Sequence, residues 1–487
     1  MTTKLSSTIA YIGYFTAEMP EKVALIVNGQ EITYRDFYRD IGKMTVGVKN
    51  LGLQAGQTVS LEHPHFYLHW LLILACESLG ITTYTYQASE LAQEDKAIGN
   101  TDFVFHSPAM APSSAKRAQV IDQDWVDGIL GLAPAAAPMP HAPMPNAPIP
   151  DKTPLRIVRG SGTTGAPKRM MYTAHIQAYW LKQYQFRMGF HRQARFLVGT
   201  GFHVETYHVF ATACLRMGGT CIVNPAERPA DLIQKHAITH YSCIPDTLIQ
   251  ILSSLPDDYP KPAHLTIIAG GAPVSQAIRN QVKERLTDTL LENYGATEVS
   301  TACGMDGNGV GWVLPGVGVQ VVDDTHTPLI GEAGRVRIKS DGCVDGYLDN
   351  PEATRAMFRD GWFYPGDEGI MIDDHTLKLV GRTDDLINVR GYKILPQPLE
   401  EMFMRELPVH DICVTDMPDG QGNFSVWVIF VPSQSDGFEK VKEKIQPLMP
   451  SKYGVIRLTE VDAIPRTASG KIQRNKLKKT LLDGSSA

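Results

Sequence analysis

The sequence predicts an α/β fold with a large N-terminal domain, built of parallel-rich sheets and helices, and a small α+β C-terminal domain. The first observation is an alternation of short apolar strands with helical segments, which is typical of α/β proteins. The second is the length of 487 residues, because a single hydrophobic core rarely organises so long a chain. The third is a change of pattern after Leu377, which leaves roughly 100 residues for a small separate domain.

The N-terminal end predicts a hairpin followed by a helix. Residues 23–27 and 31–34 have strand character, and Asn28-Gly29 between them is the favoured two-residue connection. Thr33 is a suitable N-cap for a helix that runs through Val46. Later segments alternate in the same way. We expect helices at 70–79, 209–217, from 275 and at 399–405, and strands at 81–86, 196–200, 220–223, 265–269, 290–293 and 386–390.

Composition excludes several classes of protein. A formal charge of -6 argues against a nucleic-acid-binding protein, whose binding domain is usually basic. The seven cysteines are scattered without a Cys-x-x-Cys pair, which predicts reduced thiols and no zinc or disulfide framework. The N-terminus lacks signal-peptide features, and the most apolar window, residues 70–76, is too short to span a bilayer. A cytoplasmic location without a membrane span is therefore expected.

The central feature of the sequence is a loop rich in glycine and hydroxyl residues, from Ser161 to Lys168. It follows a tract rich in proline and alanine over residues 133–150, which is typical of an exposed linker. Glycines allow backbone N–H groups to converge on an anion, and the hydroxyls and lysine add donors. The loop is not a Walker A motif, because alanine and proline follow its second glycine. Taken by itself, it is compatible with polyphosphate binding and with a solvated turn.

Three further segments have the chemistry of a nucleotide site. Gly270 and Gly271 follow an apolar strand, and strand ends of this kind bind ligands in open α/β sheets. Glu298 follows a glycine-containing strand end, where a carboxylate can hold Mg2+ together with phosphates. Asp367 lies in a predicted aromatic, glycine-bounded turn, and aspartate accepts hydrogen bonds from ribose hydroxyls. Each segment alone is equally compatible with an ordinary turn.

Taken together, these segments resemble the adenylate-forming superfamily, which includes acyl-CoA synthetases, peptide-synthetase adenylation domains and beetle luciferases. The resemblance covers most of the chain and is strongest for a free-standing acyl- or aryl-CoA synthetase. It rests on the segments SGTTGAPK, AGGAP, YGATE, GWFYPGD, GRTDDLINVRGYKI and PRTASGK, which occur in this order. One such motif is a weak signal, whereas six in sequence are specific.

The resemblance implies two domains and a two-step reaction. Residues 1–381 correspond to an N-terminal ATP- and acyl-binding domain, and residues 385–487 to a mobile C-terminal lid that carries the catalytic lysine. A carboxylate first attacks the α-phosphate of ATP, which gives acyl-AMP and pyrophosphate. A thiol then displaces AMP and forms a thioester. The implied cofactors and substrates are ATP, Mg2+ and either CoA or the phosphopantetheine arm of a carrier protein.

The resemblance also implies roles for individual residues. Lys471 approaches the acyl carboxylate and the α-phosphate, Thr297 contacts the α-phosphate, and Glu298 is the metal ligand. Asp384 is the hinge about which the small domain rotates. The nucleotide-binding residues are the pyrophosphate loop Ser161, Gly162, Thr163, Thr164, Gly165 and Lys168, the adenine wall Gly270, Gly271, Ala272 and Pro273 with Tyr294, and the ribose contacts Asp367 and Arg382.

Two positions beside the glycine-rich loop depart from the pattern of the superfamily. Gly160 stands where threonine or serine is common, and Arg169 stands where glycine is common. The loop therefore loses one hydroxyl and gains one cation. We expect these two changes to affect how the loop contacts phosphate.

The acyl pocket implied by the resemblance suits an aryl or medium-length acyl acid. Amino-acid-activating members usually carry an aspartate at the place of His203, which is here a candidate catalytic residue and pocket wall. A packed histidine is the alternative for His203. Glu205 keeps an amino-acid substrate open. The expected pocket residues are His203, Tyr207, Cys243, Ile244, Gly270, Asn293 and Val299.

Three functions are compatible with these features. The first is an acyl-CoA synthetase that acts on a small-molecule carboxylic acid. The second is an adenylating enzyme that loads a separate carrier protein, since no carrier-like helix follows Lys479. The third is a non-catalytic nucleotide-binding regulator, which the presence of Glu298 and Lys471 argues against. The basic segment 474–479 is expected to be a solvated helix face.

Overall fold

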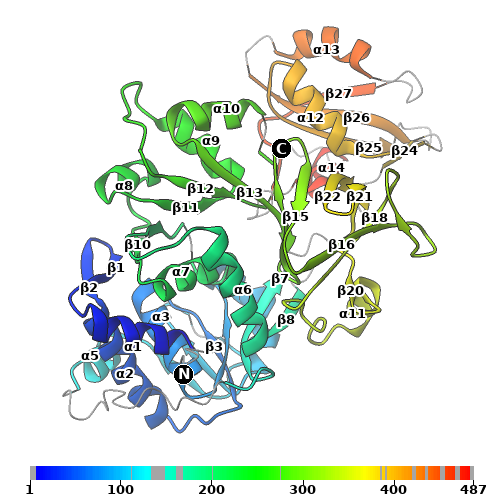
Figure 1. Ribbon diagram of the computed structural model, residues 1–487. Coiled ribbons are helices and arrows are strands. Elements are labelled where there is room, and N and C mark those ends of the chain that lie inside the picture. The colour runs from blue at the N-terminus through cyan, green and yellow to red at the C-terminus, as the bar shows by residue number, and fades with distance from the viewer. Residues whose placement is uncertain are drawn as a thin grey trace.

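The computed structural model describes most of the chain between residues 7 and 482. The described residues are 7–110, 112–132, 149–160, 168–199, 201–271, 273–274, 276–383, 387–389, 392–418, 424–433, 437–449, 456–466 and 472–482. Two large sheets with helices form the first part of the chain, and a smaller sheet with helices follows (Figure 1). This architecture confirms the predicted α/β class with a smaller α+β part after it.

A six-stranded sheet contains the strands on both sides of the glycine-rich loop. Its order is β6 (Ala118–Val120), β5 (Phe103–His106), β3 (Thr58–Leu61), β4 (Thr82–Thr85), β7 (Pro154–Gly160) and β8 (Lys168–Thr173). Its strands are parallel except for β7 and β8, which are antiparallel with Gly160 opposite Lys168. Residues 161–167, which lie outside the described residues, therefore connect two directly paired strands.

The larger sheet is parallel in its first half. That half runs in the order β2 (Gln30–Thr33), β1 (Val23–Val27), β10 (Thr220–Val223), β9 (Arg195–Leu197), β11 (His240–Cys243), β12 (Thr266–Ala269) and β13 (Thr289–Ala296). Only the β1–β2 pair in this half is antiparallel. Parallel strands place all their carboxyl ends at one edge, which is where α/β sheets bind ligands.

The second half of the larger sheet is antiparallel. It contains β14 (Ser300–Met305), β15 (Val310–Val313), β22 (Thr376–Arg382), β21 (Asp367–Asp373), β18 (Ala333–Ser340), β16 (Val317–Val322) and β17 (Pro328–Leu329). Strand β20 (Trp362–Phe363) pairs with β18, and β19 (Phe358–Arg359) pairs with β20. Strand β13 joins the two halves by pairing with β14. Strands β13 and β22 carry Tyr294 and Arg382 of the predicted nucleotide site.

Helices cover both sheets. They are α1 (Thr8–Glu18), α2 (Tyr34–Asn50), α3 (Phe66–Ser78), η1 (Ala88–Glu90), α4 (Leu91–Gly99), α5 (Gln123–Leu130), α6 (Ala174–Arg187), α7 (Glu205–Arg216), α8 (Pro229–Lys235), α9 (Pro245–Ser254), α10 (Gln276–Arg285) and α11 (Pro351–Met357). The sequence predicts α3 as a largely apolar helix, and its residues are buried on nearly every side. Such a helix is stable only inside a core, and residues of α3, α6 and α7 share one hydrophobic cluster.

The predicted hairpin and helix cap at the N-terminal end are confirmed. Asn28 and Gly29 adopt φ values of 51° and 83°, the left-handed conformation that a two-residue turn of this kind requires. The Thr33 hydroxyl accepts a hydrogen bond from the Asp36 N–H at 3.1 Å and so caps α2. Both features depend on neighbouring residues only, which makes them predictable from sequence.

Two predictions of local structure at the site are wrong. The strand expected over residues 290–293 continues to Ala296 in β13, because β14 pairs with its final residues. The sequence predicts Asp367 in a turn, whereas Asp367 begins β21 and lies opposite Arg382 of β22. In both cases the segment is extended because it pairs with another strand, and its own composition does not show which strand that is.

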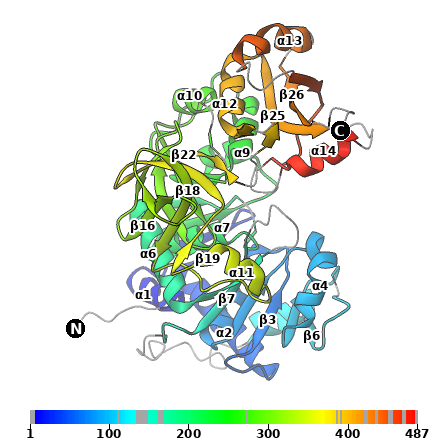
Figure 2. The same ribbon diagram turned by 90° about the vertical axis from the view of Figure 1, so that its right-hand side faces the viewer.

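The elements after residue 387 pack around their own core. They are β23 (Ile387–Val389), β24 (Tyr392–Ile394), α12 (Pro396–Glu406), β25 (Val409–Pro418), β26 (Phe424–Pro432), α13 (Gly437–Leu448), β27 (Ile456–Glu460) and α14 (Arg474–Leu482). Strands β25, β26 and β27 form a three-stranded sheet, and buried residues such as Phe403 and Phe430 form a separate cluster. Figures 1 and 2 show α12, α13, β25 and β26 at one end of the molecule.

The expectation of a fully solvated basic helix near the C-terminus is wrong for two of its residues. The Arg474 Nη2 group of α14 contacts Glu400 Oε1 of α12 at 2.5 Å, and the two side chains are 10% and 11% exposed. Lys478 forms an ion pair with Asp416 of β25. Glu400 and Asp416 belong to elements far from α14 in the sequence. The basic residues of α14 therefore hold this helix against α12 and the smaller sheet.

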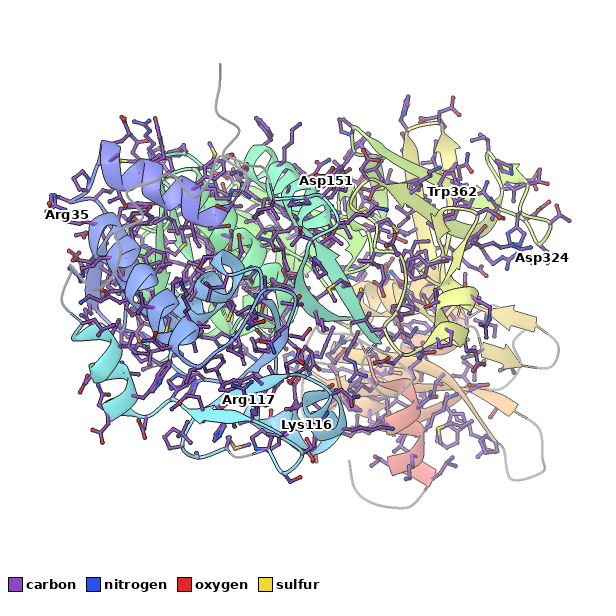
Figure 3. The ribbon with its side chains drawn as sticks, turned by 90° about the horizontal axis from the view of Figure 1, so that it is seen from below. Arg35, Lys116, Arg117, Asp151, Asp324 and Trp362 are labelled. Atoms are coloured by element: carbon purple, nitrogen blue, oxygen red, sulfur yellow. The ribbon has the colours of Figure 1, made fainter. Side chains whose placement is uncertain are left out.

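Some charged residues on the outer surface lie outside every segment that the sequence marks as a candidate functional site. Lys116 and Arg117, labelled in Figure 3, precede β6 at the end of the six-stranded sheet. The Arg117 guanidinium lies 5.3 Å from the centre of the Phe103 ring and donates to the Leu51 carbonyl, so it covers apolar surface.

Among the described residues, no helix is both long enough and apolar enough to span a bilayer.

Candidate active site

The carboxyl ends of three parallel strands place candidate pocket residues side by side. Cys243 of β11, Ala269 of β12 and Glu292 of β13 are in register. Gly270 and Asn293, which follow the last two, therefore lie next to each other at the edge of the sheet. The Gly270 N–H donates a hydrogen bond to the Cys243 carbonyl at 3.3 Å, which keeps β11 and β12 together beyond the last strand residue.

Other predicted pocket residues differ in how far they are exposed to solvent. Tyr207 on α7 lies against Gly199, where a Cβ atom would come within 3.1 Å of the Tyr207 ring. Ile244 is the N-cap of α9 and is partly exposed. Cys243 and Val299 are buried, and Val299 packs in the core of the antiparallel half. The described pocket wall is thus mainly aromatic and apolar.

Three predicted nucleotide-binding residues meet in one hydrogen-bonded group. The Tyr294 hydroxyl donates to Asp367 Oδ2 at 2.6 Å, and Arg382 Nη1 donates to Asp367 Oδ1 at 2.9 Å. Arg382 also donates to the Pro365 carbonyl at 3.1 Å. Burial, with the Asp367 charge second, raises the pKa of Tyr294, so its hydroxyl remains a donor. The group joins β13, β21 and β22 across separations of 73 and 15 residues.

Thr297 and Glu298 occupy the turn between β13 and β14. The Tyr172 hydroxyl donates to the Thr297 carbonyl at 2.5 Å, and the Tyr347 hydroxyl donates to Glu298 Oε1 at 2.8 Å. Glu298 is 8% exposed. Within the described part of the chain, no hydrogen bond reaches Glu298 Oε2. One carboxylate oxygen is thus fixed by a neutral donor, and the other is left for a ligand.

This donor set fits Mg2+. The ion prefers one or two carboxylates, and substrate phosphates and waters complete its coordination. Glu298 supplies a single carboxylate held in place by a second residue, an arrangement typical of metal ligands. Among the described residues, no group of three histidine, cysteine, aspartate or glutamate side chains could form an all-protein metal site. A single fixed carboxylate such as Glu298 suits a metal whose other ligands are phosphates and water.

Gly160 precedes the glycine-rich loop, Lys168 ends it, and both lie close to the Glu298 group. The Lys168 ammonium lies 5.1 Å from the centre of the Tyr347 ring and donates to Met357 Sδ at 3.2 Å. A Cβ atom at Gly160 would lie 3.3 Å from Glu298 Oε1, tighter than ordinary van der Waals contact. Glycine at position 160 therefore leaves room for the Glu298 carboxylate.

Arg169, the second departure from the superfamily pattern, is directed toward carboxylates of the protein. Its guanidinium lies 3.5 Å from Glu94 Oε2 of α4 and 3.5 Å from Asp349 Oδ2. On the paired strand, Arg159 contacts Glu90 at 2.6 Å. The extra cation expected at the phosphate loop is therefore balanced by Glu94 of α4 and Asp349 of the loop before α11.

His203 faces an amide group. The Gln87 Nε2 atom lies 2.8 Å from His203 Nε2 and 3.1 Å from His203 Nδ1. Burial lowers the pKa of His203 to about 4, so its ring is neutral at pH 7. Gln87 is itself held by the capping box at the start of η1. A neutral imidazole at this position can donate one hydrogen bond and accept another but supplies no charge.

Glu205 is committed to an internal ion pair. Its Oε2 atom lies 3.0 Å from Arg156 Nη2, and both side chains are buried. Its Oε1 atom lies 3.3 Å from His208 Nδ1. Burial raises the pKa of Glu205, but Arg156 and His208 more than offset this and lower it overall. The carboxylate is therefore not free to pair with the ammonium group of an amino-acid substrate.

Several predicted site residues lie outside the described residues. These are Ser161, Gly162, Thr163, Thr164, Gly165, Ala272, Asp384 and Lys471. Gly271 has a φ of 90°, and Gly271 and Pro273 are exposed beside the site. Sequence reasoning missed Tyr172, Tyr347 and Gln87, because no local pattern marks a residue whose partner is far along the chain.

Comparison with known proteins agrees with this geometry. The AMP-binding enzyme family matches residues 15–348, more than half of the chain. The chain belongs to the AMP-binding enzyme family. This family membership confirms the resemblance drawn from the six motifs.

Relatives and solved structures cover nearly the whole chain. The chain is 24% identical to 4-coumarate–CoA ligase 5 of Oryza sativa subsp. japonica, over 97% of this chain and 94% of that protein. It is 24% identical to 2-succinylbenzoate–CoA ligase of Listeria monocytogenes, over 94% and 96%. The crystal structure of ATP-bound MatB from Rhodopseudomonas palustris has a TM-score of 0.84 and 22% identity, over 98% of this chain and 99% of that one. The last comparison confirms the fold.

Proposed function

We propose that this AMP-binding enzyme is an acid–thiol ligase that activates a carboxylic acid with ATP and transfers the acyl group to CoA. The observation that carries this proposal is the meeting of Tyr294, Asp367 and Arg382 near the turn that holds Glu298. Relatives that share the length of the chain are named as CoA ligases. The first half-reaction needs ATP with a carboxylate near its α-phosphate, and the second needs the acyl-AMP held with its acyl carbon open to a thiol.

The adenosine end would lie against β12, β13 and β21. Gly270, Gly271 and Pro273 would form one wall, and Tyr294 would face the base. The Asp367 carboxylate, held by hydrogen bonds from Tyr294 and Arg382, would accept hydrogen bonds from the ribose hydroxyls. Arg382 balances the charge of Asp367, so a neutral ribose does not have to pair with a bare carboxylate.

The reaction would proceed in two displacements. An oxygen of the substrate carboxylate attacks the α-phosphorus, the bond to pyrophosphate breaks, and acyl-AMP forms. The thiolate of CoA then attacks the acyl carbon, and AMP leaves with the bonding electron pair. Thr297 would contact the α-phosphate and Lys471 would neutralise the charge that develops there. Such chemistry depends on positioning and charge neutralisation more than on covalent help from the protein.

Glu298 would hold Mg2+ beside the phosphates. The ion, when bound, neutralises the phosphate charge and orients the leaving pyrophosphate. Tyr347 would keep one oxygen of Glu298 in place and so leave the other for the metal. Burial and the Glu298 charge raise the pKa of Tyr347, which keeps its hydroxyl a donor.

Replacing Tyr347 by phenylalanine tests this arrangement. We expect Tyr347→Phe to weaken Mg2+ binding to the ATP-loaded protein by about 10-fold or more, because partners of metal ligands have effects of this size. Calorimetric titration with Mg2+ gives the affinity without relying on turnover. The matched control is Tyr259→Phe, since the Tyr259 hydroxyl donates to the Ala230 carbonyl at 2.8 Å beside α8. Equal Mg2+ affinity in Tyr347→Phe and Tyr259→Phe would contradict the role given to Tyr347.

The acid is proposed to be an aryl or medium-length acyl acid. Tyr207, Cys243 and the neutral ring of His203 offer aromatic and apolar surface, which suits such acids. The ion pair between Glu205 and Arg156 argues against an α-amino acid. The relatives act on different acids by name, so neither acid is carried over to this chain.

Residues 385–487 are proposed to act as a mobile lid that carries Lys471, with the hinge at Asp384. A lid of this kind allows one pocket to serve two reactions in turn. The separate hydrophobic cluster of the described residues after 387 supports this division. We place the boundary after residue 381.

ATP–pyrophosphate exchange with a panel of carboxylic acids tests the proposed function. At least one aryl or medium-length acid is expected to drive exchange, and addition of CoA is expected to convert the same acid to its thioester. A purified carrier protein offered in place of CoA tests the alternative acceptor. No exchange with any acid, although ATP binds, would instead favour a nucleotide-binding regulator.

A further inference from the structure

Arg187 ends α6 and reaches the predicted acyl pocket. Its Nη2 group donates a hydrogen bond to Asn293 Oδ1 at 2.6 Å. Asn293 lies on β13, just before Tyr294 of the nucleotide site. Because side chains alternate along a strand, Asn293 and Tyr294 point to opposite faces of β13. Arg187 therefore approaches from the face that does not carry the proposed adenine contact.

Arg187 differs from other arginines in the interior of the protein. Arg156 pairs with Glu205, Arg159 with Glu90, and Arg279 with Glu292. In the described part of the chain, Arg187 forms no ion pair with a carboxylate. Its Nη1 atom is buried and has no hydrogen-bond partner. Arg187 as a whole is half-buried, and a partly desolvated guanidinium without a counter-ion is unfavourable, because no partner offsets the loss of hydration.

The groups that face Arg187 are neutral. Cys303 is buried in β14, and burial raises the pKa of its thiol to about 12, so it carries no charge at pH 7. Tyr184, one turn earlier on α6, shares a hydrogen bond with the Thr301 hydroxyl at 3.0 Å. Burial lowers the pKa of Arg187, in line with an uncompensated charge. At Gly304 the missing side chain leaves space, since a Cβ atom there would lie 3.3 Å from Arg187 Nη2.

We propose that Arg187 binds a second anionic group at the far end of the acid, so that the substrate is a dicarboxylic acid. This inference rests on the proposed function. A guanidinium with one donor on Asn293 and another without a partner can hold a carboxylate with charge-assisted hydrogen bonds. The acid would thus supply the counter-ion that the protein lacks.

The position of Arg187 also bounds the length of that acid. The carboxylate to be activated would lie near Thr297, four residues after Asn293 along the chain. At about 3.3 Å per strand residue, the backbone from Asn293 to Thr297 spans at most roughly 13 Å. This span suits a medium-length dicarboxylic acid, or an aromatic acid whose second carboxylate is on the opposite side of the ring.

Matched pairs of acids test the inference. Suberate is compared with octanoate, and 4-carboxycinnamate with cinnamate, by kcat/KM in ATP–pyrophosphate exchange and by calorimetric binding. We expect the wild-type protein to prefer each diacid by at least roughly 30-fold, and Arg187→Met to remove that preference. The matched control is Lys182→Met, which removes an exposed positive charge from the same helix. Lys182→Met is expected to keep the preference.

Each outcome decides between two interpretations. Loss of the preference in Arg187→Met but not in Lys182→Met supports an anion site at Arg187. Equal loss of activity toward monoacids and diacids would mean that Arg187 merely supports Asn293, and would overturn the inference. A wild-type preference for monoacids would overturn it without any variant, even if Arg187→Met fails to fold. If monoacids alone drive exchange, the inference about Arg187 is wrong and the proposed function stands. If no acid drives exchange, both the inference and the proposed function are wrong.

Discussion

Lys471→Ala is expected to slow acyl-AMP formation by about 100- to 1,000-fold while thioester formation from supplied acyl-AMP continues. Removal of one group that stabilises a developing negative charge typically has an effect of this size. The residues on either side of the lysine loop, Arg466 and Ile472, form an antiparallel bridge, and Arg466 contacts Asp411 of β25 at 2.7 Å. Arg466, five residues before Lys471, is thus held against the smaller sheet.

The two half-reactions are measured separately. ATP–pyrophosphate exchange reports adenylation, and release of AMP from synthetic acyl-AMP with CoA reports thioester formation. Lys476→Ala is the control, since it removes the same charge from an exposed position of α14. If Lys471→Ala reduced both half-reactions equally, the lysine would not be specific to adenylation and the role proposed for it would be wrong.

Arg156→Met is expected to reduce the free energy of unfolding by about 3–5 kcal/mol. Removing one partner of a buried ion pair leaves the other charge buried without compensation, and costs of this size are typical. Arg156 also donates to the Phe202 carbonyl at 3.4 Å, next to His203. The variant should therefore weaken acid binding as well as stability, because the segment that carries His203 loses a contact.

Denaturant unfolding of three variants separates the ion pair from general effects. Arg156→Met/Glu205→Leu removes both charges and is expected to recover most of the lost stability. Arg228→Met is the matched control, since Arg228 pairs with Asp231 at 2.8 Å on the surface, where the side chains are 60% and 48% exposed. That control should change stability by less than about 1 kcal/mol. A similarly small change in Arg156→Met would show that the buried pair contributes little.

Features that depend on neighbouring residues were predictable from the sequence. The Asn28-Gly29 turn and the Thr33 cap follow from residue types that favour those conformations, and both are confirmed. Tyr294, Asp367 and Arg382, which the order of the motifs marked as candidate nucleotide-binding residues, lie together in the structure. Strand boundaries were less predictable, since pairing with β14 extends β13 to Ala296.

Contacts between distant elements were not predictable. Tyr347 supports Glu298, Gln87 faces His203, and Arg187 reaches Asn293, yet none of these three stands in a local pattern that marks it. Arg169 seemed from its position to add a cation for phosphate, whereas Glu94 and Asp349 balance it. A sequence motif names a residue type, but the partner of that residue is set by packing.

The sequence by itself therefore determined the fold class and the family, and it supplied the candidate residues of the proposed nucleotide site. Those depend on composition, periodicity and motif order, which are properties of the chain read along its length. The tertiary structure alone decided which charges are balanced. It joins Glu205 to Arg156 and leaves Arg187 without a carboxylate among the described residues. The reason is physical: the electrostatic free energy of a buried charge depends on the groups within a few ångströms, and these come from elements far apart in the chain.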